Sequence, residues 1–250
     1  MRAILVVLAL LLPAQLQAAE IKILATGIFR GFFPQIISQF ERSSGHKVVL
    51  TTTTPFALKD RLLQGEDADV VIAVTPIMKD IEQAEKIIQA SRAKVGEVYV
   101  AVAVRAGAPR PDLSTPDAVK RAILTAKAVA INDPKSGSNI ARFVMGLADR
   151  FAFNAELRSR FKLFPGGGDQ VARAVVNGDA DFGITISSEI LAVKGAEIAG
   201  RLPPEMQQVN IAYGFLVPGT KQEEAGAAFI KFLLSPDVKT LMKANGIETD

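Results

Sequence analysis

The 250-residue sequence has no cysteine and no tryptophan, only two tyrosines and a single histidine, His46. The absence of cysteine excludes disulfides, a lipid-anchoring cysteine and cysteine-dependent nucleophilic or zinc sites. The shortage of tyrosine and tryptophan argues against aromatic stacking platforms for sugars or nucleobases. These absences remove several common ways of building an enzyme or a nucleic-acid-binding module.

Other catalytic signatures are also missing. His46 follows Gly45 at a predicted helix end, on the side away from the ligand-bearing edge identified below, so we expect it to face solvent and to take no part in catalysis. No His-Glu-x-x-His spacing occurs, and the run PGGGDQ (165–170) lacks the Lys-Ser/Thr of a phosphate-binding loop. The sequence therefore predicts no catalytic residue, no metal site and no cofactor.

The sequence also has no large excess of positive or negative charge: 29 basic side chains are mixed with 26 acidic ones, and no polybasic run occurs. Nothing in this balance indicates nucleic-acid or membrane-surface binding. One long apolar run, residues 3–12, lies between Arg2 and the small residues that end at Ala19. This pattern predicts a signal peptide over residues 1–19 and export of a soluble protein to a bacterial periplasm.

Beyond residue 20, strand-like and helix-like periods alternate along the chain. Strands are predicted at residues 21–26, 47–52, 69–74, 98–104, 128–131, 161–164, 181–186 and 210–217. Helices are predicted to begin at Pro34, Pro55, Pro76, Ser138 and Asp169, with one or two more over residues 222–244. This alternation predicts an α/β fold of mostly parallel strands with helices on both faces.

Two segments share one local plan, LLQGEDADVVIA (62–73) and VVNGDADFGIT (175–185). In each, a helix ends at a glycine, and an acidic residue and Ala-Asp then lead into a buried strand. Each glycine is expected to adopt the left-handed conformation that stops a helix. The aspartates of these turns are interpreted as turn and strand caps rather than as acid–base pairs.

The repeated plan predicts two similar lobes with mixed, mostly parallel sheets, joined by a two-strand hinge. Residues 20–104 are predicted to form the first part of lobe I and residues 105–204 lobe II. Residues 205–250 are predicted to return to lobe I and to supply the C-terminal helices. A ligand would then lie between the lobes.

Five loops leave the carboxyl ends of predicted strands, the edge at which parallel sheets bind ligands. They are ATGIFRG (25–31), TTTTP (51–55), NDPKSGSN (132–139), PGGGDQ (165–170) and TISSE (185–189). They supply backbone amides, and four of them add hydroxyls, so together they predict a small-anion site. Thr53 or Thr54 is expected to cap the helix at Pro55 while another hydroxyl faces the cleft. The plainer alternative is that these threonines are only strand and cap residues.

The order of these segments resembles the molybdate-binding proteins of ABC importers, within the bilobal periplasmic binding proteins of type 2. Residues 21–50 resemble the first strand, ligand loop and helix of that family. LLQGEDADVVIAV (62–74) resembles its Gly-x-x-Asp-Val segment, and GDADFGITISSEI (178–190) the counterpart in lobe II. The resemblance implies a monomeric periplasmic receptor that is not an enzyme and that delivers a small anion to an ABC permease in the inner membrane.

The same resemblance implies a set of ligand-binding positions in this sequence. They are Thr26 or Gly27, Thr53 or Thr54, Ser136 or Gly137, and the segment from Gly168 to Gln170. In the last loop, where molybdate binders have a tyrosine, this chain has Ile186, which cannot donate a hydrogen bond, and the candidate is Ser187. Asp169 is interpreted as a helix cap, since a carboxylate would repel an anion.

Arg30 bears on the nature of the ligand. The planar guanidinium group matches a carboxylate, whereas a tetrahedral oxyanion can be held by neutral donors alone. Arg30 is therefore expected to contact the ligand if the ligand is a carboxylate, the alternative being a solvated surface arginine. The family resemblance favours an oxyanion such as molybdate. A receptor for a small organic carboxylate and an exported ligand-sensing protein remain the alternatives.

Overall fold

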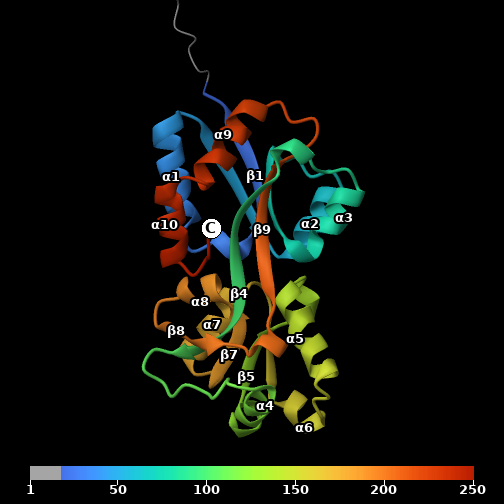
Figure 1. Ribbon diagram of the computed structural model, residues 1–250, viewed down its shortest axis with the longest axis vertical. Helices are drawn as coiled ribbons and strands as arrows, with labels where there is room; N and C mark the ends of the chain where they lie inside the picture. Colours follow the sequence, from blue (N-terminus) through green and yellow to red (C-terminus); the bar gives the residue numbers. More distant parts are fainter. Residues whose placement is uncertain (1–17) are drawn as a thin grey trace, which may run out of the picture.

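The computed structural model describes residues 18–250, so the predicted signal peptide lies almost wholly outside the described residues. Two lobes are stacked along the longest axis and joined by β4 and β9 (Figure 1). The strands are β1 (Glu20–Thr26), β2 (Lys47–Thr53), β3 (Val70–Val74), β4 (Ala93–Arg105), β5 (Val129–Asn132), β6 (Phe161–Phe164), β7 (Phe182–Ile186), β8 (Ala196–Arg201) and β9 (Val209–Leu216). The helices are α1 (Phe33–Ser44), α2 (Pro55–Leu63), α3 (Thr75–Gln83), α4 (Pro116–Thr125), α5 (Asn139–Arg150), α6 (Ala155–Ser159), α7 (Gly168–Asn177), α8 (Ser187–Leu191), α9 (Glu223–Leu233) and α10 (Pro236–Ala244). Short 3₁₀ turns lie at η1 (Gly27–Phe29), η2 (Gln89–Ser91), η3 (Pro134–Ser136) and η4 (Pro204–Met206).

The strands follow the order β2-β1-β3-β9-β4-β7-β5-β6, with β8 paired to β4. In each lobe three strands run parallel: β1 with β2 and β3, and β5 with β6 and β7. The long strand β4 is antiparallel to β9 through Ala93–Tyr99 and to β7 through Val100–Ala103, so it belongs to both sheets. The predicted bilobal α/β fold is confirmed; the lobe boundaries remain a prediction.

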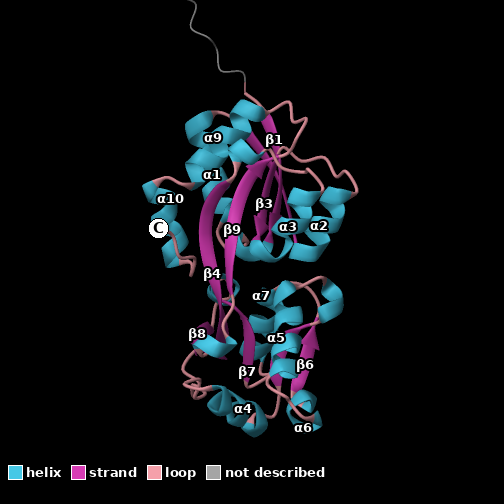
Figure 2. Ribbon diagram, turned by 45° about the vertical axis from the view of Figure 1, so that its right-hand side comes forward, coloured by secondary structure: helices cyan, strands magenta, loops and turns pink. Residues whose placement is uncertain are grey.

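Burial on both faces of the sheet explains why β3, a central strand of lobe I, is an unbroken hydrophobic run. In β3, Val70, Ile72 and Val74 belong to one apolar cluster, while Val71 and Ala73 belong to a second one under α2 and α3. A strand covered on both faces needs apolar residues at every position. Figure 2 shows these strands between helices on either side, with their carboxyl ends directed toward the other lobe.

The local plan that residues 62–73 and 175–185 share has a structural basis. Gly65 and Gly178 both have left-handed φ values, 88° and 85°. Asp69 accepts a hydrogen bond from the Lys22 amide of β1 at 2.7 Å, and Asp181 accepts one from the Lys127 amide, just before β5, at 2.5 Å. These carboxylates hold strand starts in place, as predicted.

Several elements differ from the sequence-based expectations. Strand β4 begins at Ala93, five residues before the predicted start, and α4, α6, α8 and β8 were not predicted. The prediction that His46 faces solvent is wrong, because its side chain is buried. Its ring lies 6.0 Å from that of Phe40, and Nδ1 accepts a hydrogen bond from the Ala19 amide. Within residues 18–250, no helix is both long and apolar enough to cross a membrane.

Candidate functional site

Three α-helices start at one crevice between the lobes. The first residues of α2, α5 and α7, which are Pro55, Asn139 and Gly168, all line the same cavity. Helix N-termini carry partial positive charge and amides without intrahelical partners. The crevice therefore lies where both lobes favour a negative group.

Apolar side chains make up part of the crevice wall, and the space inside is small. Ile28, Val74, Ile140 and Ile186 line it beside the polar residues. The cavity volume is about 30 Å³, enough for about two water molecules. A larger guest requires the lobes to move apart, so the structure corresponds to a closed form.

Several predicted site residues meet at this cavity. Its lining includes Thr26, Gly27, Arg30, Thr53, Thr54 and Gly168. Thr26 is fully buried, and its hydroxyl has no hydrogen-bond partner among the described residues. A buried hydroxyl without a partner costs free energy unless a ligand or a water satisfies it, so this hydroxyl is available to a guest.

The threonine run was expected to cap α2, and the structure shows a different arrangement. Thr54 occupies the N-cap position, but its hydroxyl makes no cap hydrogen bond. It donates to the Ser136 carbonyl of lobe II at 2.8 Å, and the Phe56 amide donates to the Gly137 carbonyl at 3.2 Å. The start of α2 is thus tied to lobe II, and the prediction that this threonine caps the helix is wrong.

The remaining predicted positions lie outside the cavity lining. The Ser136 hydroxyl donates to the Asp133 carbonyl of its own loop, and the Ser187 hydroxyl donates to the Gly246 carbonyl at 2.6 Å. Gln170 donates to Asp169. Gly137 is left-handed, and a Cβ there would lie 2.8 Å from the Thr54 hydroxyl oxygen. Their roles toward a ligand stay predictions.

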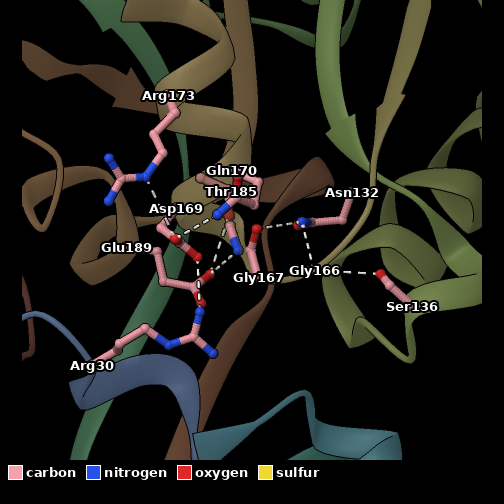
Figure 3. Close-up of polar contacts among 11 residues, drawn as sticks. Arg30, Asn132, Ser136, Gly166, Gly167, Asp169, Gln170, Arg173, Thr185 and Glu189 are labelled. Carbon is pink, nitrogen blue, oxygen red and sulfur yellow. Dashed lines mark hydrogen bonds and ion pairs between the residues drawn. The ribbon is translucent and has the colours of Figure 1, made fainter.

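Arg30 and Asp169 form an ion pair between the lobes, with Nη1 and Oδ1 3.0 Å apart (Figure 3). Asp169 was expected to cap α7, but the N-cap residue is Gly167 and Asp169 follows the helix start. Its carboxylate also accepts a hydrogen bond from Gln170 at 3.0 Å and lies 3.8 Å from Arg173. Arg30 is therefore held toward the cleft by a carboxylate of the other lobe.

Asn132 fixes the glycine loop that precedes α7. Its side-chain amide donates to the carbonyls of Gly166 at 3.1 Å and Gly167 at 2.8 Å. Gly168 has little room for a side chain, since a Cβ there would lie 1.8 Å from the Thr185 hydroxyl oxygen. The loop PGGGDQ therefore needs a glycine at position 168, where the start of α7 lines the crevice.

The sequence reasoning gave no role to Glu189, which lines the crevice from α8. Its carboxylate accepts a hydrogen bond from the Gly168 amide at 2.9 Å and a longer one from the Thr185 hydroxyl at 3.4 Å. Burial, and next the negative charge of Asp169, raise the pKa of Glu189 to about 7; Arg30 acts in the opposite direction. Figure 3 shows the carboxylate between Arg30 and the start of α7.

Asn139 and Asn210 are further lining residues that were not predicted. Asn139 donates to the Asn210 side chain at 2.9 Å, which joins α5 to β9. In the sequence, their signal was only that Asn139 ends a predicted loop and Asn210 begins a predicted strand. Groups of three or more metal-ligating side chains do not occur in the described residues.

Comparisons with known proteins agree with this architecture. A curated relative from Pseudomonas sp., named aconitate isomerase, is 29% identical over 243 residues, covering 95% of this chain and 90% of the relative. The solved periplasmic molybdate-binding protein of Azotobacter vinelandii superposes with a TM-score of 0.73 at 16% identity, covering 92% of this chain and 99% of that one. The sulfate-binding protein of Mycobacterium tuberculosis gives 0.72 at 19% identity, covering 93% and 88%.

The predicted resemblance to molybdate-binding-type receptors is confirmed at the level of family and fold. The structural likenesses have low sequence identity and therefore show the fold alone. The sequence model described as bacterial extracellular solute-binding protein matches residues 21–248. Since this match spans nearly all of the described residues, the chain belongs to the family of bacterial extracellular solute-binding proteins.

Proposed function

We propose that the protein is a periplasmic receptor for a small organic polycarboxylate, which it delivers to an ABC permease in the inner membrane. The observation that carries this proposal is the crevice itself. It combines Arg30, the start of α7 and the unpaired Thr26 hydroxyl, and its Gly168 amide already holds a carboxylate, that of Glu189. A carboxylate is therefore a group that these donors accommodate.

The crevice supports an organic anion over a tetrahedral oxyanion such as molybdate, the ligand class that the sequence favoured. Ile28, Val74, Ile140 and Ile186 line it, and such a wall suits a carbon skeleton. Arg30 offers a planar fork that matches a carboxylate. The name of the curated relative, aconitate isomerase, points to tricarboxylates for the first test.

Binding requires the lobes to separate and to close again around the guest. The polar contacts between the lobes, including those of Arg30 and Thr54, would be exchanged in part for contacts with the ligand. A ligand that bridges both lobes stabilises the closed form by its differential affinity for that form. The permease would then recognise the liganded, closed receptor.

Thermal unfolding and calorimetric titration of the purified protein test the proposal. The panel contains citrate, cis- and trans-aconitate, succinate, molybdate, tungstate, sulfate and phosphate. A tricarboxylate at a thousandfold excess over its dissociation constant should add about 4 kcal/mol of stability. Stabilisation by molybdate or sulfate alone would favour an oxyanion receptor, and no response to any anion would refute the proposal.

Thr26→Val tests the crevice directly. Because the hydroxyl has no partner within residues 18–250, its replacement by a methyl group should leave stability unchanged or slightly higher. Affinity for the carboxylate should fall about tenfold through the lost hydrogen bond. Ser188→Ala is the matched control, since that hydroxyl is also buried and unpaired among the described residues but does not line the cavity. Equal affinity in both variants would remove Thr26 from the site.

A further inference from the structure

Two titratable side chains line the crevice, and they are bound differently. Arg30 is paired with Asp169. Glu189, within residues 18–250, has no basic group within 4.0 Å, although its Oε1 and the Arg30 Nη2 both face Gly27. A Cβ built on that glycine would lie 3.0 Å from Oε1 and 3.3 Å from Nη2. In its ionised form Glu189 would repel an anionic guest, so the carboxylate form does not serve simple anion binding.

Glu189 is placed to exchange a proton at neutral pH. Its pKa of about 7 means that the acid and the carboxylate are both well populated there, which is the condition for a group that must accept and return a proton. One neutral hydroxyl and one amide contact its Oε2 atom. The other oxygen, Oε1, has no hydrogen-bond partner among the described residues, so it is available to a bound molecule.

The chain offers few other groups for covalent or proton chemistry in this place. It has no cysteine to add to a double bond, and its one histidine is buried against Phe40 in lobe I. Asp169 is engaged by Arg30 and Gln170. A reaction in the crevice would therefore use Glu189 as its base.

We propose that the protein isomerises an unsaturated polycarboxylate in this crevice, with Glu189 as the catalytic residue that moves a proton between two carbons of the bound molecule. The proposal rests on the carboxylate site proposed above. It adds an activity to that site, which differs from the sequence-based expectation that the protein is not an enzyme.

The step is a 1,3-shift in which atoms and electrons balance. The Glu189 carboxylate removes a proton from the methylene carbon beside the double bond, and the C–H electron pair forms a new double bond. The electrons of the old double bond form a C–H bond at its far carbon, which takes a proton back from Glu189. No oxidant or reductant is needed. Arg30 and the start of α7 stabilise the negative charge that spreads over the allylic carbons and the carboxylates.

The test uses the purified protein with trans-aconitate in D₂O, followed by NMR. The expected result is formation of the cis isomer together with deuterium at the methylene carbon. Glu189→Gln should lower both rates by about 100-fold or more, while the dissociation constant from calorimetry changes by less than about tenfold. Glu224→Gln, which alters an exposed glutamate on α9, should behave as wild type. Thermal unfolding confirms that both variants fold.

The possible failures distinguish this proposal from the preceding one. If trans-aconitate binds at the crevice but neither isomerises nor exchanges deuterium, the activity is refuted and the receptor function stands. Turnover that persists in Glu189→Gln would refute the assignment of this residue. If no unsaturated polycarboxylate binds while a saturated one does, the activity is likewise refuted and the receptor stands. If no carboxylate binds at all, both proposals fail.

Discussion

The Glu189 carboxyl is expected to make the stability of the folded state depend on pH. Its pKa is raised from 4.5 to about 7 by burial and by the negative charge of Asp169, against the opposing influence of Arg30. Between these pH values the folded protein retains a proton that the unfolded chain has released. Stability should therefore fall as pH rises from about 4.5 to about 7, by at most about 3 kcal/mol from this group.

Glu189→Gln should remove this part of the pH dependence. The variant and the wild type should have similar stability near pH 4.5, and the variant should be the more stable above pH 7, as measured by denaturant unfolding at several pH values without ligand. Glu224→Gln provides the comparison, since that side chain is exposed. Parallel pH curves for wild type and Glu189→Gln would show that the Glu189 carboxyl is not desolvated in solution.

Some residues of the site could be predicted from the sequence, and others could not. Thr26, Arg30, Thr54 and Gly168 could be placed at the crevice because they follow strands at the ligand-binding edge. Glu189 could not, because a glutamate in the first turn of a helix has the same sequence signal whether it faces water or a buried amide. The partner that gives it its role, Gly168, lies 21 residues away, so only the tertiary fold reveals the contact.

At the scale of elements, the packing of α7 on β7 depends on Gly183. A Cβ at this position would lie 2.5 Å from the Val171 Cγ1 and 3.2 Å from the Val175 Cγ2. Gly183→Ala should therefore destabilise the protein by about 1–3 kcal/mol through overpacking, measurable as a lower midpoint in denaturant unfolding. Because α7 carries Gly168, the same variant should also weaken ligand binding.

Gly146→Ala is the matched control for that substitution. Gly146 lies inside α5, and a Cβ there would meet no atom within 4 Å. Alanine should stabilise this helix by about 0.5–1 kcal/mol, since it restricts the unfolded chain without a clash. If the two variants changed stability in the same direction, close packing would not be the reason for the glycine in β7.

Among the elements, local signals predicted the parallel βα units well and the irregular parts poorly. The strand β3 and the helices at Pro55 and Pro76 carry apolar runs and helix-start prolines that require no tertiary knowledge. The sequence did contain a signal for α4, because the Thr115 side chain caps it by accepting from the Ala118 amide at 3.1 Å. In contrast, β8 is defined by its pairing with β4, which local sequence does not encode.

On the scale of the whole molecule, direct polar contacts hold the two lobes together. Thr54 and the Phe56 amide bind the loop at Ser136, Ser187 binds the Gly246 carbonyl, and Arg30 binds Asp169. Such contacts compete with any guest, because a ligand that displaces them must replace the free energy by which they stabilise the closed form. We therefore expect the free protein to exchange between this closed form and a more open one that admits the guest.

Asp169→Asn should shift that equilibrium toward the open form. The variant removes the charge that holds Arg30 across the crevice and leaves the guanidinium group for the ligand. The ligand-free radius of gyration from small-angle X-ray scattering should increase, and affinity for a carboxylate ligand should rise several-fold because one like charge has gone. Asp149→Asn, which breaks an ion pair with Arg158 inside lobe II, should change neither quantity. If Asp169→Asn stayed as compact as wild type and bound more weakly, Asp169 would be needed to orient Arg30 toward the ligand, and the ion pair would be part of the binding site rather than a competitor of the guest.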